Sequence, residues 1–259
     1  MEEIFSQLPT PLEILLDPIS LIVYVIFGGL FLWEFMFPAR QLPKIKFWKL
    51  RGLVFFLAYM LLTTYFPLLW DDFFASHQLV DLSSLPIFLQ VILGLLVFEL
   101  VQYGWHISMH KSDFLFRVSH QIHHSAERID VPSAFMLSIN DMIGLSLVGS
   151  VSFALIMGLT PQAITIIVLS LTFFGVFQHS NINTPRWIGY IIQRPESHNL
   201  HHARGIHKYN YTDLAIIDML FGTFKNPKTY QHETGYYFGA SNRIFEMLRF
   251  KDITSKKSS

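Results

Sequence analysis

The sequence predicts an all-α fold: a multi-pass membrane bundle of about four to five hydrophobic helices with a histidine-rich helical cap on the cytoplasmic side. Three observations predict it. Hydrophobic residues make up 51% of the 259-residue chain and charged residues only 15%, whereas soluble domains carry roughly 25% charged residues. Long apolar runs recur along the chain, and histidines gather where several of those runs end. We therefore expect one membrane-embedded domain over residues 1–259.

Five apolar runs come close to the roughly 20 residues that a helix needs to cross a bilayer. They cover about 19–37, 52–70, 85–105, 134–159 and 162–178. The last two are joined by the short connection LTPQ, so they form either a helical hairpin or two half-spans. Asn140 and Asp141 fall within the fourth run and leave its depth in the membrane open. The first residues are acidic and lack the basic stretch of a cleaved signal peptide, so we expect them in the mature protein.

The placement of lysine and arginine predicts the orientation, because cytoplasmic loops carry an excess of both. The loop after the first run holds five of them, and residues 71–84 hold none. With that loop in the cytoplasm, residues 106–133 and 179–259 face the same side, and so do all nineteen lysines and arginines. We expect an integral protein of a bacterial inner membrane or the endoplasmic reticulum, with eleven of its twelve histidines facing the cytoplasm and His77 as the exception.

Two features of the composition exclude classes of function. There is no cysteine, which excludes disulfides, thiolate catalysis and cysteine-ligated metal sites. The net charge is zero, so nothing suggests a nucleic-acid partner.

Nine of the twelve histidines fall in four clusters with helical spacing. The segments HQIHH and HNLHH repeat the spacing i, i+3, i+4, which places each set on one helical face. Neutral imidazole is the commonest protein ligand for metals. One ion takes four to six ligands, so nine imidazoles suggest two ions, and nitrogen ligands suit zinc, iron, copper or nickel. The candidate ligands are His106, His110, His120, His123, His124, His179, His198, His201 and His202. The alternatives are histidines with a structural role and a loosely binding histidine-rich tract, but neither is typical of such a regular pattern.

The segments WHISMH, HQIHHS, FQHSNIN and RPESHNLHH, in this order and close to this spacing, resemble those of the membrane fatty acid hydroxylase and sterol desaturase superfamily. The resemblance runs from about Glu99 to the segment DMLFGTF at 218–224. It implies a membrane non-haem di-iron enzyme that uses O2 and two electrons to hydroxylate or desaturate an unactivated C–H bond of a lipid or sterol. It also implies that the nine histidines bind the two iron ions. Zinc has no redox chemistry, which agrees with iron.

The resemblance adds two residues to the predicted site. Asn183 follows His179 by four residues, where some hydroxylases of the family have a second histidine. It would bind iron directly, bind through water, or leave that iron more open. Glu99 lies seven residues before His106 on the same helical face, near a position where the family tends to have a carboxylate. We expect Glu99 to act in catalysis by holding the free N–H of a ligand imidazole; the alternative is a paired or snorkelling acid.

Several polar residues lie close to the ligands in the sequence. Glu127, Asp130, Glu196 and His207 either support the ligands or are solvated loop residues. Arg194 is predicted to anchor its loop or to meet a phosphate headgroup.

The chain has no GxGxxG nucleotide loop, no cysteine for an iron–sulfur cluster and no haem motif. We therefore expect electrons from an external protein, cytochrome b5-like or a ferredoxin with its reductase, docking near Lys225, Lys228 and Arg243. Two alternative functions remain open at this point. One is the same chemistry on ether lipids or carotenoids. The other is a membrane metal transporter or metal-binding protein, which would place polar ligands along a path at mid-membrane.

Overall fold

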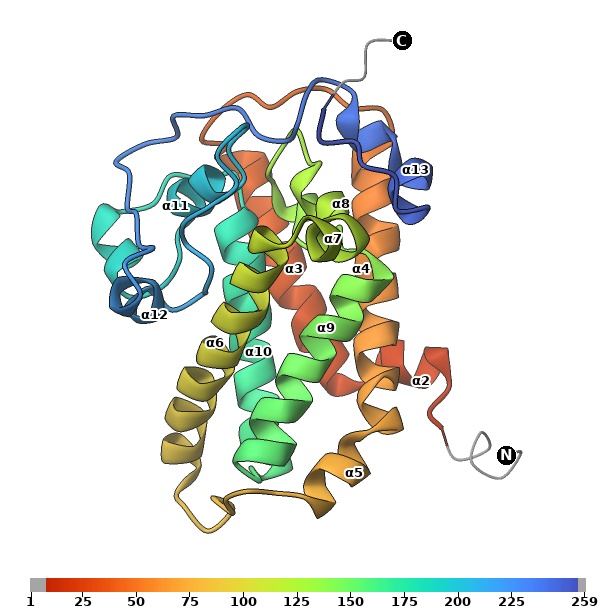
Figure 1. Ribbon diagram of the computed structural model, residues 1–259, viewed down its shortest axis with the longest axis vertical. Helices are drawn as coiled ribbons and strands as arrows, with labels where there is room; N and C mark the ends of the chain where they lie inside the picture. Colours follow the sequence, from red (N-terminus) through yellow and green to blue (C-terminus); the bar gives the residue numbers. More distant parts are fainter. Residues whose placement is uncertain (1–7, 256–259) are drawn as a thin grey trace.

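The computed structural model describes residues 8–255, and over this range the chain is helical, with two isolated β-bridges and no strand (Figure 1). Five helical segments are long and apolar enough to cross a membrane, which confirms the predicted fold class. They are α3 (Pro18–Met36), α4 (Trp48–Tyr65) with the 3-10 turn η1 (Pro67–Leu69), α6 (Ile87–Lys111), α9 (Ile139–Ser150) with the π-helical turn η4 (Val151–Ile156), and α10 (Pro161–His179). The first residues of the chain, 1–7, lie outside the described range.

Local sequence signals set the helix boundaries. The side chains of Asp17, Ser138 and Thr160 each accept a backbone N–H at the start of α3, α9 and α10, which satisfies an otherwise unpaired donor. The fourth span was predicted from residue 134, but it begins at Ile139 because residues 131–133 form a separate 3-10 turn, η3 (Val131–Ser133). Since α9 with η4 and α10 are each long enough to cross a membrane, the structure favours a hairpin over two half-spans.

The five spans form a closed ring. Helix α9 packs between α4 and α6, and α10 packs between α6 and α3. An aromatic contact links α3 to α4, where the rings of Phe27 and Phe56 stack with centroids 4.4 Å apart. At Gly94, a Cβ atom would lie 2.3 Å from Cδ1 of Ile167, so a larger residue there would force the Ile167 side chain between α6 and α10 to move.

The short helices divide between the two ends of the ring. Among the described α-helices, the short helices α2 (Pro11–Leu16) and α5 (Asp71–Ser76) lie outside the cap, and α5 is at the far end of the bundle in Figure 1. The cap at the other end comprises α7 (Asp113–Leu115), η2 (Phe116–His120), α8 (Gln121–His124), η5 (Arg186–Tyr190), α11 (Pro195–His201), α12 (Ala215–Leu220), η6 (Ala240–Asn242) and α13 (Ile244–Leu248).

A buried acid in α3 ties the cap to the bundle. The Oε2 atom of Glu34 accepts the backbone N–H groups of Val131 and Asn181 at 3.0 and 2.9 Å. These two residues follow the first histidine repeat and the end of α10. These two hydrogen bonds hold the segment after the first histidine repeat and the end of α10 against α3, the first span.

Candidate metal centre

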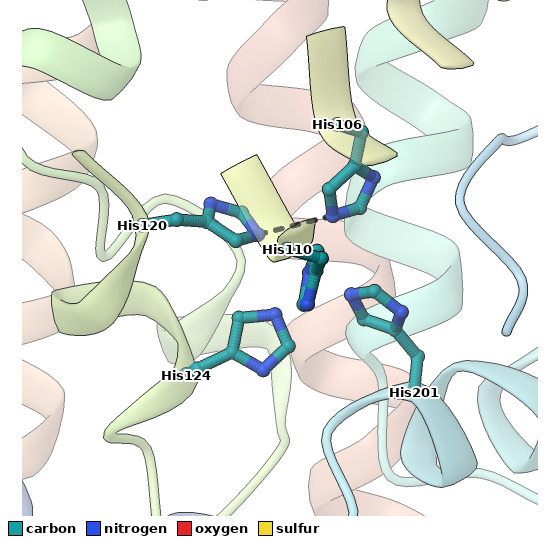
Figure 2. Close-up of side chains that lie close together, drawn as sticks. All are labelled: His106, His110, His120, His124 and His201. Atoms are coloured by element: carbon teal, nitrogen blue, oxygen red, sulfur yellow. Dashed lines mark hydrogen bonds between the residues drawn. The ribbon is translucent and has the colours of Figure 1, made fainter. Parts of the chain in front are cut away.

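The structure gathers the nine predicted histidines into two groups. Within each group, one nitrogen from every imidazole lies within 4.8 Å of the corresponding nitrogens of the others. The five-histidine group, drawn in Figure 2, contains His106, His110, His120, His124 and His201. The four-histidine group contains His123, His179, His198 and His202. The groups are adjacent, because the rings of His124 and His202 stack with centroids 4.2 Å apart.

Each HxxHH segment divides its histidines between the two groups. In the first segment, His120 and His124 join the five-histidine group and His123 joins the other. In the second segment the division is reversed, because His198 and His202 join the four-histidine group and His201 joins the five-histidine group. Successive helical residues are rotated by about 100°, so position i+4 lies about 40° to one side of position i, and position i+3 lies about 60° to its other side. The repeat therefore gives each group one i, i+4 pair and one single imidazole.

The spacing of the ring nitrogens fits adjacent ligands on one ion. The Nε2 atoms of His106 and His120 are 3.0 Å apart. In the four-histidine group, Nε2 of His179 lies 3.0 Å from that of His198 and 3.2 Å from that of His123. With a metal–nitrogen bond of ~2.1 Å, two ligands at right angles are about 3.0 Å apart. Both groups therefore fit a bound metal ion.

In the five-histidine group, Nδ1 atoms are held from outside the group. Asp141 on α9 lies 2.7 Å from Nδ1 of His120. The backbone carbonyls of Tyr211 and Tyr209 lie 2.7 Å from Nδ1 of His106 and His201. Such bonds fix the ring orientation and leave Nε2 for the metal. The buried Nε2 atoms of His110, His124 and His201 have no hydrogen-bond partner among the described residues, as expected of ligand atoms.

An unusual backbone segment positions these carbonyls. His207, Tyr209 and Asn210 all have positive φ values, between 42° and 70°, a conformation uncommon for residues other than glycine. The segment folds back over α11, and Nδ1 of His207 lies 2.9 Å from Nδ1 of His124. Burial lowers the pKa of His207 to about 4. Of the two roles left open by the sequence, the contact with His124 favours that of a supporting residue for His207.

In the four-histidine group only one ring has such support. Nδ1 of His179 lies 2.6 Å from the Gly175 carbonyl. The Nδ1 atoms of His123, His198 and His202 are buried and have no hydrogen-bond partner among the described residues. Their orientation depends on packing against the neighbouring rings.

The cap histidines of both groups are in the protonation state that binds metal. Burial lowers the pKa of His120, His123, His124, His198, His201 and His202, and the charge of neighbouring imidazoles lowers it further. A neutral imidazole has a free lone pair, and so the site needs little proton release when an ion binds.

The other two predicted site residues behave differently from the histidines. Asn183 is exposed in the loop after α10, whereas all four imidazoles of the neighbouring group are buried; its role as a ligand stays a prediction. Glu99 makes no hydrogen bond to a ligand imidazole among the described residues, so its role in catalysis stays a prediction. Glu99 is fully buried, and its Oε2 accepts the backbone N–H of Asp213 at 2.9 Å. Nδ1 of His106, the ligand nearest to Glu99 in the sequence, faces the Tyr211 carbonyl at 2.7 Å.

The residues flanking the ligands brace the cap. Glu127 accepts the backbone N–H groups of Gly239 and Ser241, and Asp130 accepts the indole N–H of Trp48. Glu196 accepts the backbone N–H of Thr184 at 2.9 Å. Arg194 is fully buried and donates to the carbonyls of Thr184 and Pro227 and to Asn226. Arg194 therefore anchors its loop and does not reach a headgroup.

A cavity of about 490 Å³ extends from the histidines into the bundle. Near the histidines it is lined by His106, His120, His123, His179 and His198, from both groups. Further along, its walls come from α4, α6, α9, η4 and α10 and are mainly apolar, with Phe98, Phe135, Leu145, Phe153 and Leu171 among them. The site can therefore take a long apolar ligand whose end or side reaches the metal-binding nitrogens.

Asp141 was not assigned a role from the sequence. The available signal was an acid within an apolar run, which is costly in a membrane and usually functional. The supporting carbonyls of Tyr209, Tyr211 and Gly175 carry no sequence signal, because every residue has a carbonyl.

Fold and site together define an integral membrane protein with two adjacent, largely buried groups of histidines that could each hold a metal ion. The family model for fatty acid hydroxylases matches residues 91–223, which is just over half the chain and contains all nine histidines. The chain belongs to the fatty acid hydroxylase family.

Curated relatives carry names from lipid oxidation. The chain is 29% identical over 146 residues to ornithine lipid hydroxylase OlsE of Rhizobium tropici, covering 55% of this chain and 44% of that protein. It is 26% identical over 172 residues to sphinganine C4-monooxygenase 1 of Arabidopsis thaliana, covering 63% and 65%. It is 31% identical over 152 residues to the very-long-chain aldehyde decarbonylase GL1-9 of Oryza sativa subsp. indica, covering 52% and 54%. The chain thus matches about half to two thirds of each relative. No solved structure matches.

Proposed function

We propose that this protein is an O2-dependent di-iron oxidoreductase that hydroxylates or desaturates an unactivated C–H bond of a lipid or sterol. The observation that carries the proposal is the position of the two histidine groups at one end of a largely apolar cavity inside a membrane bundle. The family and the two relatives named as lipid hydroxylase and sphinganine monooxygenase support oxidation of a lipid.

The residues present fit iron. Each group offers neutral nitrogen ligands at the spacing of adjacent ligands on an ion, and zinc cannot perform redox chemistry. Two bound irons with O2 and two electrons would supply the oxidant for the C–H bond. The chain itself holds the ligands through Asp141 and the carbonyls of the cap, binds the apolar part of the substrate, and excludes water that would quench a reactive oxidant.

The alternative substrates, ether lipids and carotenoids, would occupy the same cavity. A metal transporter is less consistent with the structure, because both groups lie at one end of the bundle and the cavity beyond them is mainly apolar. Transport would need polar ligands along the whole path.

Metal analysis and lipid profiling test the proposal together. Purified protein is expected to carry about two irons per chain, and cells that contain the gene are expected to gain a hydroxylated or unsaturated lipid only in the presence of O2. A protein with one tightly bound zinc and no iron, or an unchanged lipid profile under air, would contradict it.

The proposal includes the orientation and the electron source. The distribution of lysine and arginine supports a cytoplasmic cap, and the exposed Lys225 and Lys228 support docking there of a cytochrome b5-like or ferredoxin-type donor. Arg243 is already engaged by Glu246 at 2.6 Å. Because the chain has no cysteine, single cysteines can be introduced for labelling. We expect exposed cap positions to react from the cytoplasm and residues 71–84 from the opposite side; labelling of both sets from one side would overturn the orientation.

A further inference from the structure

The cavity has a second polar end, remote from the histidines. There it is lined by Thr63, Thr64, Asp71 and Ser150. The Ser150 hydroxyl accepts the indole N–H of Trp70 at 2.8 Å and hydrogen-bonds with the side chain of Asp71. Asp71 begins α5, at the opposite end of the bundle from α8 and α11 (Figure 1).

One oxygen of Asp71 is buried without a partner. The side chain is half-buried, and its Oδ1 atom is enclosed and accepts no hydrogen bond from any described residue. The nearby hydroxyls of Thr63 and Thr64 donate to carbonyls one turn earlier in their own helix. A buried acceptor without a donor is costly. A ligand in the cavity that brings a donor to Oδ1 would remove this cost.

The distance between the two ends follows from α9. Asp141 contacts the ligand His120 and Ser150 contacts the Asp71 end, and both line the cavity. They are nine residues apart in one α-helix, which corresponds to roughly 14 Å at 1.5 Å per residue. The wall between the ends includes the apolar side chains of Leu145, Phe153, Ile164, Val168 and Leu171.

We propose that Asp71 and Ser150 bind the remote polar end of the substrate, and that the substrate is a long apolar molecule with a hydroxyl or ammonium donor at that end. The inference rests on the proposed function, since it takes the carbon to be oxidised to lie at the histidines. A carboxylate at the remote end would be repelled by Asp71, and a purely apolar end would leave Oδ1 without a donor.

A competing place for the polar end lies near the histidines. Gln102 Oε1 and Trp105 Nε1 are buried without partners and line the same cavity. Gln102 precedes His106 by one helical turn. Binding there would put the polar end of the substrate beside the metal centre, so the experiment must separate Gln102 from Asp71.

Binding of four probes of equal chain length tests the proposal: a straight-chain primary alcohol, the amine, the carboxylic acid and the alkane. Dissociation constants come from the ligand dependence of thermal unfolding of the purified protein in one detergent. The alcohol and the amine are expected to bind roughly tenfold or more tightly than the acid and the alkane, the usual worth of a hydrogen bond to a charged group.

Three variants locate the effect. Asp71→Leu is expected to abolish the preference for both donors, and the nearly isosteric Asp71→Asn to abolish the preference for the amine. Asp72→Asn removes the neighbouring exposed carboxylate and is expected to change nothing. Equal binding of all four probes to the natural protein, or a preference that is lost in Gln102→Leu and kept in both Asp71 variants, would overturn the proposal. The measurement needs no turnover, so a negative lipid profile would refute the proposed function separately.

Discussion

The two histidine groups differ in what holds their rings. In the five-histidine group, a carboxylate, two backbone carbonyls and a further imidazole contact the Nδ1 atoms of four ligands. In the four-histidine group, only His179 has a Nδ1 contact, with a carbonyl one turn earlier in its own helix. Metal-bound histidines usually have such outer partners, and these affect affinity strongly. The rings of the five-histidine group are therefore held in position before a metal binds. The four-histidine group has fewer ligands, and fewer of its Nδ1 atoms have a hydrogen-bond partner.

The source of the support explains the difference. The partners of the five-histidine group come from α9 and from the segment around Tyr209 and Tyr211, both remote in sequence from most of the ligands that they hold. Three ligands of the four-histidine group have buried Nδ1 atoms without partners, and the group borders the cavity through His123, His179 and His198. We expect the imidazole rings of the four-histidine group to change orientation more than those of the five-histidine group when a metal or a substrate binds.

Loss of one ligand from either group should have the largest effect. His123→Ala in the four-histidine group and His201→Ala in the five-histidine group are each expected to lower lipid oxidation below about 1% of the natural protein, a larger loss than outer partners cause. If two ions act as one unit, as the proposed function requires, the double variant should be no worse than either single variant. Product formation and iron content per chain measure this.

The control for these variants is His232→Ala, because His232 is an exposed histidine outside both groups. All variants should still insert in the membrane, since apolar spans and not metal drive insertion. Activity retained in one ligand variant would show that its group is structural.

Asp141→Asn should have the next largest effect. The substitution keeps the shape but removes the carboxylate that faces Nδ1 of His120, so it weakens the hold on one ring of the five-histidine group. We expect a loss of 10–100-fold in activity or iron affinity, the usual range for such partners. Asn140→Asp is a useful comparison, because the neighbouring Asn140 donates to the Val118 carbonyl and contacts no imidazole. Unchanged iron affinity in Asp141→Asn would mean that the negative charge of Asp141 is not needed and that a neutral acceptor at Nδ1 of His120, or packing, is enough to orient the ring.

The two groups should lose metal at different rates. When iron-loaded protein is exposed to a chelator, we expect about one equivalent to leave first, from the four-histidine group, because it has fewer ligands and three of them lack an Nδ1 partner. Iron remaining against time measures this. Asp141→Asn should bring the two losses closer together, since it weakens only the other group. Loss of both equivalents in one step in the natural protein would show that the groups are not independently stable.

The parts of this centre that were predictable from the sequence are those set by local patterns. Apolar runs predicted the five spans to within a few residues at most ends, and i, i+4 spacing predicted that His106 and His110 share a face of the helix that continues to Lys111. The division of each HxxHH segment between two groups was not predicted. A rotation of about 100° per residue separates His123 from His124, but only the packing of α8 against α11 decides which direction meets which partner.

Contacts between remote elements were beyond the sequence. Asp141 contacts His120 because the first turn of α9 lies beside the cap, and Glu99 contacts the backbone of Asp213 across more than a hundred residues. The spacing of residues along α6 predicted an imidazole partner for Glu99, because spacing relates only residues of the same helix. In the folded chain the backbone N–H of Asp213, in the loop after α11, takes that position.

Glu99→Gln should have the smallest effect of these changes. The glutamine side chain keeps an oxygen that can accept the backbone N–H of Asp213, and it is uncharged, which lowers the cost of burying it within a span. The segment that supplies the Tyr211 carbonyl to His106 should therefore stay in place, and we expect activity within about tenfold of the natural protein, below the 10–100-fold range of direct imidazole partners. Glu99→Leu removes the acceptor and leaves the N–H of Asp213 unpaired, a cost of about 1–3 kcal/mol, so it should lower both thermal stability and activity. The measurement is the ratio of the activities of the two variants. If Glu99→Gln lowers activity as much as Glu99→Leu, the charge of Glu99 matters in the reaction. Glu99 would then have to be counted among the groups that support the five-histidine group.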